Sequence, residues 1–228
     1  MKRPTRSETL FRQYCETLLY TVEKIPEAEK RTPDFRVITP HGTIITEIKE
    51  ACPNDEDVRM ATEMKLWGRT SWCELPGKRV RAMLNDATGQ TRSSSEQQLP
   101  CAVILYDNVI VDGERPRSQN SFFTGFDIAT GMYGQLETVL TFAGQTSEVI
   151  EARNQLGGNR TLRSNKDEQI NAVCVLTEDA KLKTPCLWVY HNSFASFPLS
   201  RKIFCGAEDK HFKNPGDEDF FRNSWVEF

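Results

Sequence analysis

The first clear pattern of apolar residues lies between Ser7 and about Lys24. Apolar side chains recur there at i, i+3, i+4, i+7, i+8 and i+11, namely at Phe11, Tyr14, Cys15, Leu18, Leu19 and Val22. A single apolar stripe with this spacing predicts an amphipathic helix. Helical patterns also occur at 56–67 and at about 78–88, and helix-like patterning at 135–142.

Strand-like patterns lie between these helices. Residues 34–39 and 43–49 are rich in β-branched side chains, and the turn cluster Pro40-His41-Gly42 separates them. They predict two strands of a hairpin. The run CAVILY at 101–106 is apolar throughout, which is typical of a strand buried on both faces. Two further strands are predicted at 170–176 and 185–190, and the serine-rich stretch 89–100 is predicted to be a loop.

The register of the hairpin follows from its turn. If Pro40 and His41 form a two-residue loop, Thr39 lies opposite Gly42 and Asp34 lies opposite Glu47. Directly opposed residues share a face about 5 Å apart, and a shift of one residue would place the two carboxylates on opposite faces. Because alternate residues of a strand share a face, Lys49 points the same way as Glu47.

Two carboxylates and an ammonium group on one surface suit a specific chemistry. Hard divalent cations such as Mg²⁺ prefer carboxylate oxygens and complete their coordination shell with water and substrate phosphate. Such an ion polarises a phosphodiester and lowers the pKa of a bound water. A neighbouring lysine can orient that water or stabilise the charge that develops on phosphorus. The alternative is a surface hairpin whose Glu and Lys side chains are solvated.

Pro33, Asp34, Glu47 and Lys49, spaced as Asp-x12-Glu-x-Lys, resemble the PD-(D/E)xK phosphodiesterase superfamily. The resemblance is sharpest over residues 8–50. It implies an α/β fold with a restriction-endonuclease-like αβββαβ core, a mixed central sheet flanked by helices, and a C-terminal β-rich extension. It also implies that Asp34 and Glu47 bind Mg²⁺, with Mn²⁺ as a substitute, and that Lys49 is catalytic.

The resemblance implies further site residues. Related nucleases often carry a glutamate on the first helix that reaches the metal, and Glu8 is the candidate here, with Glu16 as second choice. A helix at 78–88 would flank the substrate cleft, so Lys78, Arg79 and Arg81 are candidates for phosphate contacts. Each of these side chains can equally be read as part of a solvated helix surface.

Composition narrows the class of protein. The chain has 228 residues, 38% of them hydrophobic and 27% charged, which is an ordinary composition for a globular protein. This length predicts a single nuclease-like domain, with its core at about 7–110 and a C-terminal extension at about 111–228. No apolar run is long enough to span a bilayer, so we expect a cytoplasmic protein without membrane contact. Seven cysteines without a C-x-x-C motif favour reduced thiols, and three scattered histidines do not indicate a metal cluster.

These observations predict a metal-dependent nuclease that hydrolyses phosphodiester bonds, with DNA preferred to RNA as the nucleic-acid partner. The alternative is a noncatalytic binding or assembly subunit that retains the nuclease scaffold. A net charge of −3 excludes a strongly basic nucleic-acid binder but not a nuclease with a local basic rim. A homodimer is a possible assembly, since cutting two strands at one place usually needs two sites, although no sequence feature supports it.

Overall fold

The computed structural model describes residues 3–27, 32–68, 77–96, 98–111, 123–134, 136–142, 149–156, 161–162, 168–178, 184–214 and 225–228. Its helices are α1 (Arg6–Thr17), α2 (Asp55–Trp67), α3 (Lys78–Glu96) and α4 (Gly125–Tyr133). Its strands are β1 (Thr21–Lys24), β2 (Phe35–Thr39), β3 (Gly42–Ala51), β4 (Cys101–Asp107), β5 (Leu136–Phe142), β6 (Val149–Leu156), β7 (Ile170–Glu178), β8 (Pro185–His191), β9 (Lys210–Lys213) and β10 (Val226–Glu227).

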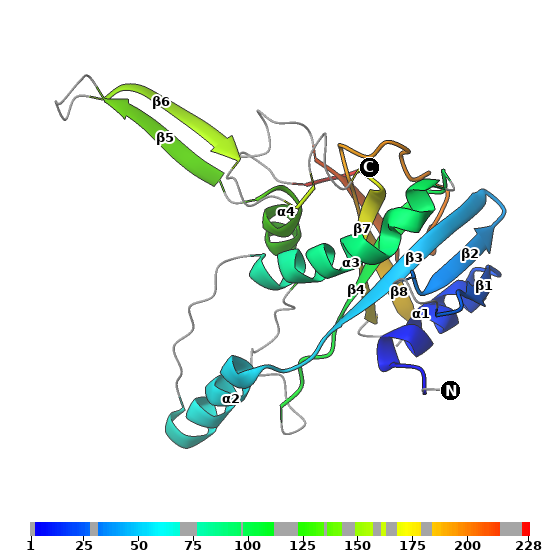
Figure 1. Ribbon diagram of the computed structural model, residues 1–228. Helices are drawn as coiled ribbons and strands as arrows, with labels where there is room; N and C mark the ends of the chain where they lie inside the picture. The colour runs from blue at the N-terminus through cyan, green and yellow to red at the C-terminus, as the bar shows by residue number, and fades with distance from the viewer. Residues whose placement is uncertain are drawn as a thin grey trace.

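Eight of the strands form one mixed sheet in the order β1-β2-β3-β4-β7-β8-β9-β10. Strands β1, β2 and β3 form an antiparallel meander, and β3, β4 and β7 run parallel to one another. Strand β8 is antiparallel to β7, and β9 is parallel to β8. The fold is therefore α/β with a mixed central sheet, and the C-terminal strands widen this sheet. The remaining two strands, β5 and β6, pair as a hairpin that projects from the body of the protein (Figure 1).

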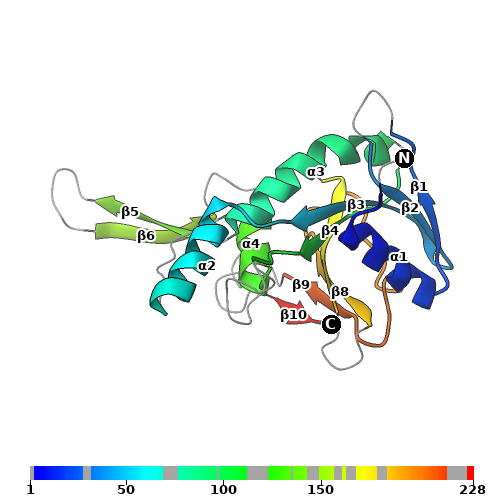
Figure 2. The ribbon, with the colours of Figure 1, turned by 90° about the horizontal axis from the view of Figure 1, so that it is seen from below.

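Helices cover both faces of the sheet. Figure 2 shows α1 on one side of β3 and β4, and α3 on the other. Along β4, Ile104 packs in the cluster that contains α1 residues, whereas Val103 and Leu105 pack in the cluster that contains residues of α3 and α4. Every residue of β4 is buried, as the apolar run predicts. The alternation of β3 side chains between these two clusters fixes the face on which each polar residue of the hairpin lies.

The first helix is shorter than its pattern predicts. It ends at Thr17, and Leu19 adopts a positive φ of 57° before the chain turns into β1. Residues 21–24 are therefore strand and not helix. The apolar residues Leu18, Tyr20 and Val22 still pack on the α1 cluster, which explains why the helical spacing continues past the end of the helix. The sequence also predicts Ser7 as the N-cap, but the helix begins two residues earlier, with Thr5 as the N-cap and a capping box between Thr5 and Glu8.

Two other sequence predictions are wrong. Helix α3 continues to Glu96 through residues predicted to be loop, although Gly89 and three serines have low helix propensity. Contacts outweigh propensity there, since Thr91 is buried and Gln90 binds Lys49. Residues 136–142 form β5 and not a helix, and β6 supplies their hydrogen-bond partners.

The C-terminal segment is anchored by aromatic packing. Trp225 stacks edge-on against Tyr190 at 4.9 Å between ring centroids, and its indole N–H donates to the Gly125 carbonyl at 2.7 Å. The sequence predicts that Phe220 and Phe221 also pack this segment onto the core, and both residues lie outside the described ranges. No helix in the described part of the chain is long and apolar enough to cross a membrane.

Helices α3 and α4 approach closely where Gly131 faces Val80. A Cβ atom placed on Gly131 would lie 2.6 Å from the Val80 Cβ, whereas one placed on Gly89 would meet nothing within 4 Å. We expect Gly131→Ala to lower the free energy of unfolding by about 1 to 3 kcal/mol through overpacking. Gly89→Ala, the matched control in α3, should raise it by up to about 1 kcal/mol through helix propensity. Urea unfolding measures both values, and an equal stabilisation by the two variants would contradict the close packing.

Candidate active site

The β2–β3 hairpin has the register that its turn predicts. Thr39 pairs with Gly42 and Phe35 pairs with Thr46, so Pro40 and His41 form the two-residue loop. The Thr39 hydroxyl donates to the Gly42 carbonyl at 2.9 Å and accepts from the His41 amide at 3.1 Å. Gly42 has a φ of 132°, which side chains rarely allow. This local turn chemistry brings the start of β2 beside the middle of β3.

Asp34 is the residue immediately before β2, at the end of the ladder. Its backbone amide donates to the Thr46 carbonyl at 3.1 Å, and its carboxylate Oδ2 accepts from the Ile48 amide at 2.9 Å. The other oxygen, Oδ1, accepts from the Lys24 ammonium at 2.9 Å. These contacts hold the Asp34 carboxylate in one orientation against β3, next to Glu47.

Glu47 is buried within β3, with 1% of its surface exposed. Its Oε1 lies 2.9 Å from the Lys49 ammonium, whereas the buried Oε2 has no hydrogen-bond partner among the described residues. Burial, together with the negative charge of Asp34, raises the pKa of Glu47 to about 7, and Lys49 offsets only part of this shift. A buried carboxylate oxygen without a partner is unfavourable unless another group completes its bonding.

Lys49 lies between β3 and α3. Its ammonium donates to Gln90 Oε1 at 2.6 Å and to the Asp86 carboxylate, in addition to its contact with Glu47. Burial alone would lower the pKa of Lys49, but the hydrogen bond to Asp86 and the charge of Glu47 raise it above its ordinary value. Lys49 is therefore a cation at neutral pH. It can orient water or stabilise negative charge, but it cannot accept a proton.

Three residues of this arrangement were not predicted from the sequence. Asp86 and Gln90 lie one turn apart on α3, and Lys24 is the last residue of β1. The i, i+4 spacing of Asp86 and Gln90 would have signalled a shared helix face, but Gln90 fell in a stretch predicted to be loop. Lys24 was not identified as a site residue because its segment was predicted to be helix.

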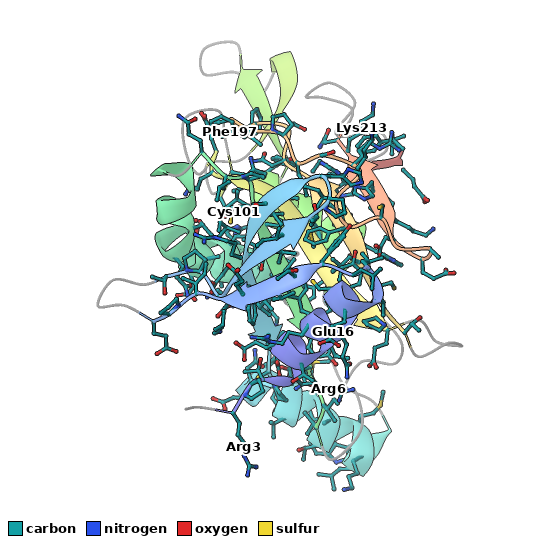
Figure 3. The ribbon with its side chains drawn as sticks, turned by 90° about the vertical axis from the view of Figure 1, so that its right-hand side faces the viewer. Arg3, Arg6, Glu16, Cys101, Phe197 and Lys213 are labelled. Atoms are coloured by element: carbon teal, nitrogen blue, oxygen red, sulfur yellow. The ribbon has the colours of Figure 1, made fainter. Side chains whose placement is uncertain are left out.

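The two candidate helix glutamates lie at opposite ends of α1. Glu8 Oε2 accepts from the Thr5 amide at 2.8 Å, and its Oε1 accepts from Lys24 at 2.6 Å, which places it one side chain away from Asp34. Burial would raise the pKa of Glu8, but the hydrogen bond from Lys24 leaves it below its ordinary value. Glu16 is exposed near the other end of the helix (Figure 3), about 12 Å along the axis.

The three basic residues at the start of α3 have different environments. Lys78 is exposed. Arg79 does not point outward as its position on the helix suggested: its guanidinium lies 2.7 Å from Asp57 on α2, and only 12% of its side chain is exposed. Arg81 is partly buried, and its Nε and Nη2 donors have no hydrogen-bond partner among the described residues. Lys78 therefore has an exposed ammonium that a phosphate could contact, whereas the two Arg81 donors are buried.

Two of the three histidines are adjacent, which their sequence separation did not indicate. His191 Nε2 and His211 Nδ1 are 2.9 Å apart, and His211 Nε2 donates to the Phe204 carbonyl at 2.8 Å. Burial, together with the charge of Arg201, lowers the pKa of His191 to about 4. The pair thus stays neutral and joins β8 to β9 as a structural contact.

The residues around Asp34 and Glu47 fit a hard divalent cation. The buried Glu47 Oε2 atom has no hydrogen-bond partner in the part of the chain that the structure describes, and each Asp34 oxygen can accept a further bond. The described residues contain no cluster of three or more His, Cys, Asp or Glu side chains arranged for a metal. Two carboxylates suffice for Mg²⁺, which keeps several water ligands. No family model, curated protein or solved structure matches this chain.

The burial of Glu47 predicts a pH-dependent effect of Glu47→Gln on stability. In EDTA-treated protein at pH 8, we expect the variant to unfold with a free energy about 1 to 3 kcal/mol higher than the wild type. Glu47 is ionised above pH 4.5 in the unfolded chain but only above about 7 in the folded one. Its contribution to stability is therefore complete below pH 4.5 and is lost as the pH rises through 7.

Glutamine is neutral at every pH and avoids this loss. Urea unfolding of both proteins at pH 5 and pH 8 measures the effect. The difference in free energy of unfolding between the variant and the wild type should be much smaller at pH 5 than at pH 8. Titrating groups that do not interact with Glu47 are common to the two proteins and cancel. The same difference at both pH values would show that the charge of Glu47 is not destabilised by burial.

Proposed function

We propose that this protein is a metal-dependent nuclease of the PD-(D/E)xK type, with DNA as its substrate. The observation that carries the proposal is the Oε2 atom of buried Glu47, which lacks a hydrogen-bond partner within the described ranges and lies beside Asp34 and the protonated Lys49. A carboxylate in this state is destabilising in the free protein, and a divalent cation would complete its bonding.

The order of elements around the site supports the same proposal. Helix α1, the meander β1-β2-β3, helix α3 and strand β4 follow one another along the chain. Strand β4 is parallel to β3, and α1 and α3 lie on opposite faces of the sheet. This order is compatible with the αβββαβ core that the resemblance implies, with α2 inserted between β3 and α3, and so supports the proposal. Asp34 immediately precedes β2, and Glu47 and Lys49 lie within β3.

In the proposed mechanism Asp34 and Glu47 hold the cation. The bound ion would polarise the scissile phosphodiester and supply a water of lowered pKa. Lys49 contributes a positive charge fixed by Asp86 and Gln90, so that it can stabilise the additional negative charge on phosphorus. The Ile48 amide keeps the Asp34 carboxylate turned towards Glu47.

The choice of DNA comes from the resemblance, since metal and lysine act on the phosphate that DNA and RNA share. Lys78, which is exposed at the start of α3, could contact the phosphate backbone, and Arg81 could do so only if its buried donors became accessible. Arg79 is a weaker candidate for this role because Asp57 already binds it. A homodimer remains a prediction that the single chain does not test.

A cleavage assay tests the function directly. We expect the purified protein to cut supercoiled plasmid with Mg²⁺ or Mn²⁺ and not with EDTA, and Lys49→Ala to reduce the rate by at least about 100-fold. Asp34→Asn should also abolish cleavage, because asparagine lacks the negative charge that binds the ion. The asparagine side chain can still accept the hydrogen bond from the Ile48 amide, so the local structure should be kept. Thermal unfolding should show that both variants are folded.

Lys210→Ala is the matched control. Lys210 forms an exposed ion pair with Glu227 at 3.3 Å on the far side of the sheet, so its loss should leave the cleavage rate unchanged. Single-stranded DNA and RNA are assayed in parallel. Cleavage of RNA alone would correct the substrate, and equal cleavage by the wild type and both site variants would place the activity elsewhere.

A further inference from the structure

Lys24 occupies a position between two carboxylates. Its side chain crosses the ring of Phe35, with the ammonium 4.6 Å from the ring centroid. The ammonium then lies 2.6 Å from Glu8 Oε1 and 2.9 Å from Asp34 Oδ1. Phe35 and its neighbours in the α1 cluster fix Lys24 on the α1 face of the sheet, whereas Lys49 contacts α3 on the opposite face. Asp34 lies at the strand end, where a cation can reach it from both faces.

The contacts around Asp34 show where a further cation can bind. Glu8 and Asp34 share the Lys24 ammonium, whereas the buried Oε2 atom of Glu47 has no hydrogen-bond partner among the described residues. The position between Glu8 and Asp34 is therefore already occupied by a positive charge. A second divalent ion beside Asp34 would have to displace the ammonium from Glu8 and Asp34, or lie close to this like charge in a partly buried site.

We propose that Lys24 serves as a built-in cation of this site, filling the position between Glu8 and Asp34 so that the protein binds a single divalent ion. The inference rests on the proposed nuclease function and adds the number of ions that the site takes. Glu8 then acts as the anchor of the ammonium and is not a ligand of the metal. Lys24 positions Asp34 for the metal that Asp34 shares with Glu47.

The contacts of Lys24 keep it charged. Partial burial would lower its pKa, but the hydrogen bonds to Glu8 and Asp34 raise the pKa above that of an ordinary lysine. An ammonium with two short carboxylate contacts is held in place and not merely near the site. The Glu8 side chain is fixed in turn by the capping box at the start of α1.

Calorimetric titration of the full chain with Mn²⁺ tests the inference without any substrate. We expect the wild type to bind one ion and Lys24→Ala to bind two, because the variant leaves the Glu8 and Asp34 carboxylates without their cation. Lys24→Met, which keeps the packing on Phe35, should give the same result if the alanine variant is unstable. Lys210→Ala, which removes a lysine from a remote ion pair, should bind one ion.

The double variant Lys24→Ala/Glu8→Gln should return to one ion, because glutamine keeps the capping box but not the charge. One ion in the wild type, in Lys24→Ala and in Lys24→Met would overturn the role of Lys24 and leave the nuclease site intact. Two ions in the wild type would also overturn it, since Lys24 would then exclude nothing. No ion in the wild type would instead remove the basis of the proposed function.

Discussion

The charge of Glu47, buried in the middle of β3, must be balanced by groups that the sheet and helices bring to it, and these groups define the site. Lys49 balances one oxygen from the same strand, and α3 holds Lys49 in place through Asp86 and Gln90. The other oxygen has no partner among the described residues, although it is buried. The folded protein thus keeps a carboxylate that is poorly satisfied, as is common where binding or catalysis takes place.

Asp34 connects this buried centre with the opposite face of the sheet. It precedes β2, so its carboxylate extends past the end of the ladder and is reached by Lys24 from the α1 side and by the Ile48 amide from β3. The site therefore depends on α1 and α3 at once, although neither helix contributes a residue of the Asp-x12-Glu-x-Lys pattern. The Asp-x12-Glu-x-Lys pattern alone therefore does not indicate which contacts fix its side chains in place.

The parts of the site that depend on local structure could be predicted from the sequence. The turn at Pro40 and His41 fixes the pairing of β2 with β3, and the two-residue period of a strand places Lys49 beside Glu47. The α/β class with a mixed sheet follows from the alternation of helical and strand patterns. The partners supplied by distant segments could not be predicted, because the position of Lys24 depends on where α1 ends, and that of Gln90 on tertiary contacts that extend α3. Residues 136–142 show the same limit, since their strand requires β6.

The eight-stranded sheet is open, and its ends in the described part of the chain are β1 and β10. An exposed edge strand offers unpaired N–H and C=O groups to which another chain can add, and short, charged edges reduce that risk. Strand β1 has four residues, including Glu23 and Lys24, and β10 has two residues, one of them Glu227. Two copies of the protein would therefore gain little from joining their sheets edge to edge. Contacts between copies would then use surfaces other than the two ends of this sheet, and Lys24 contributes to protecting the β1 edge as well as to holding Asp34.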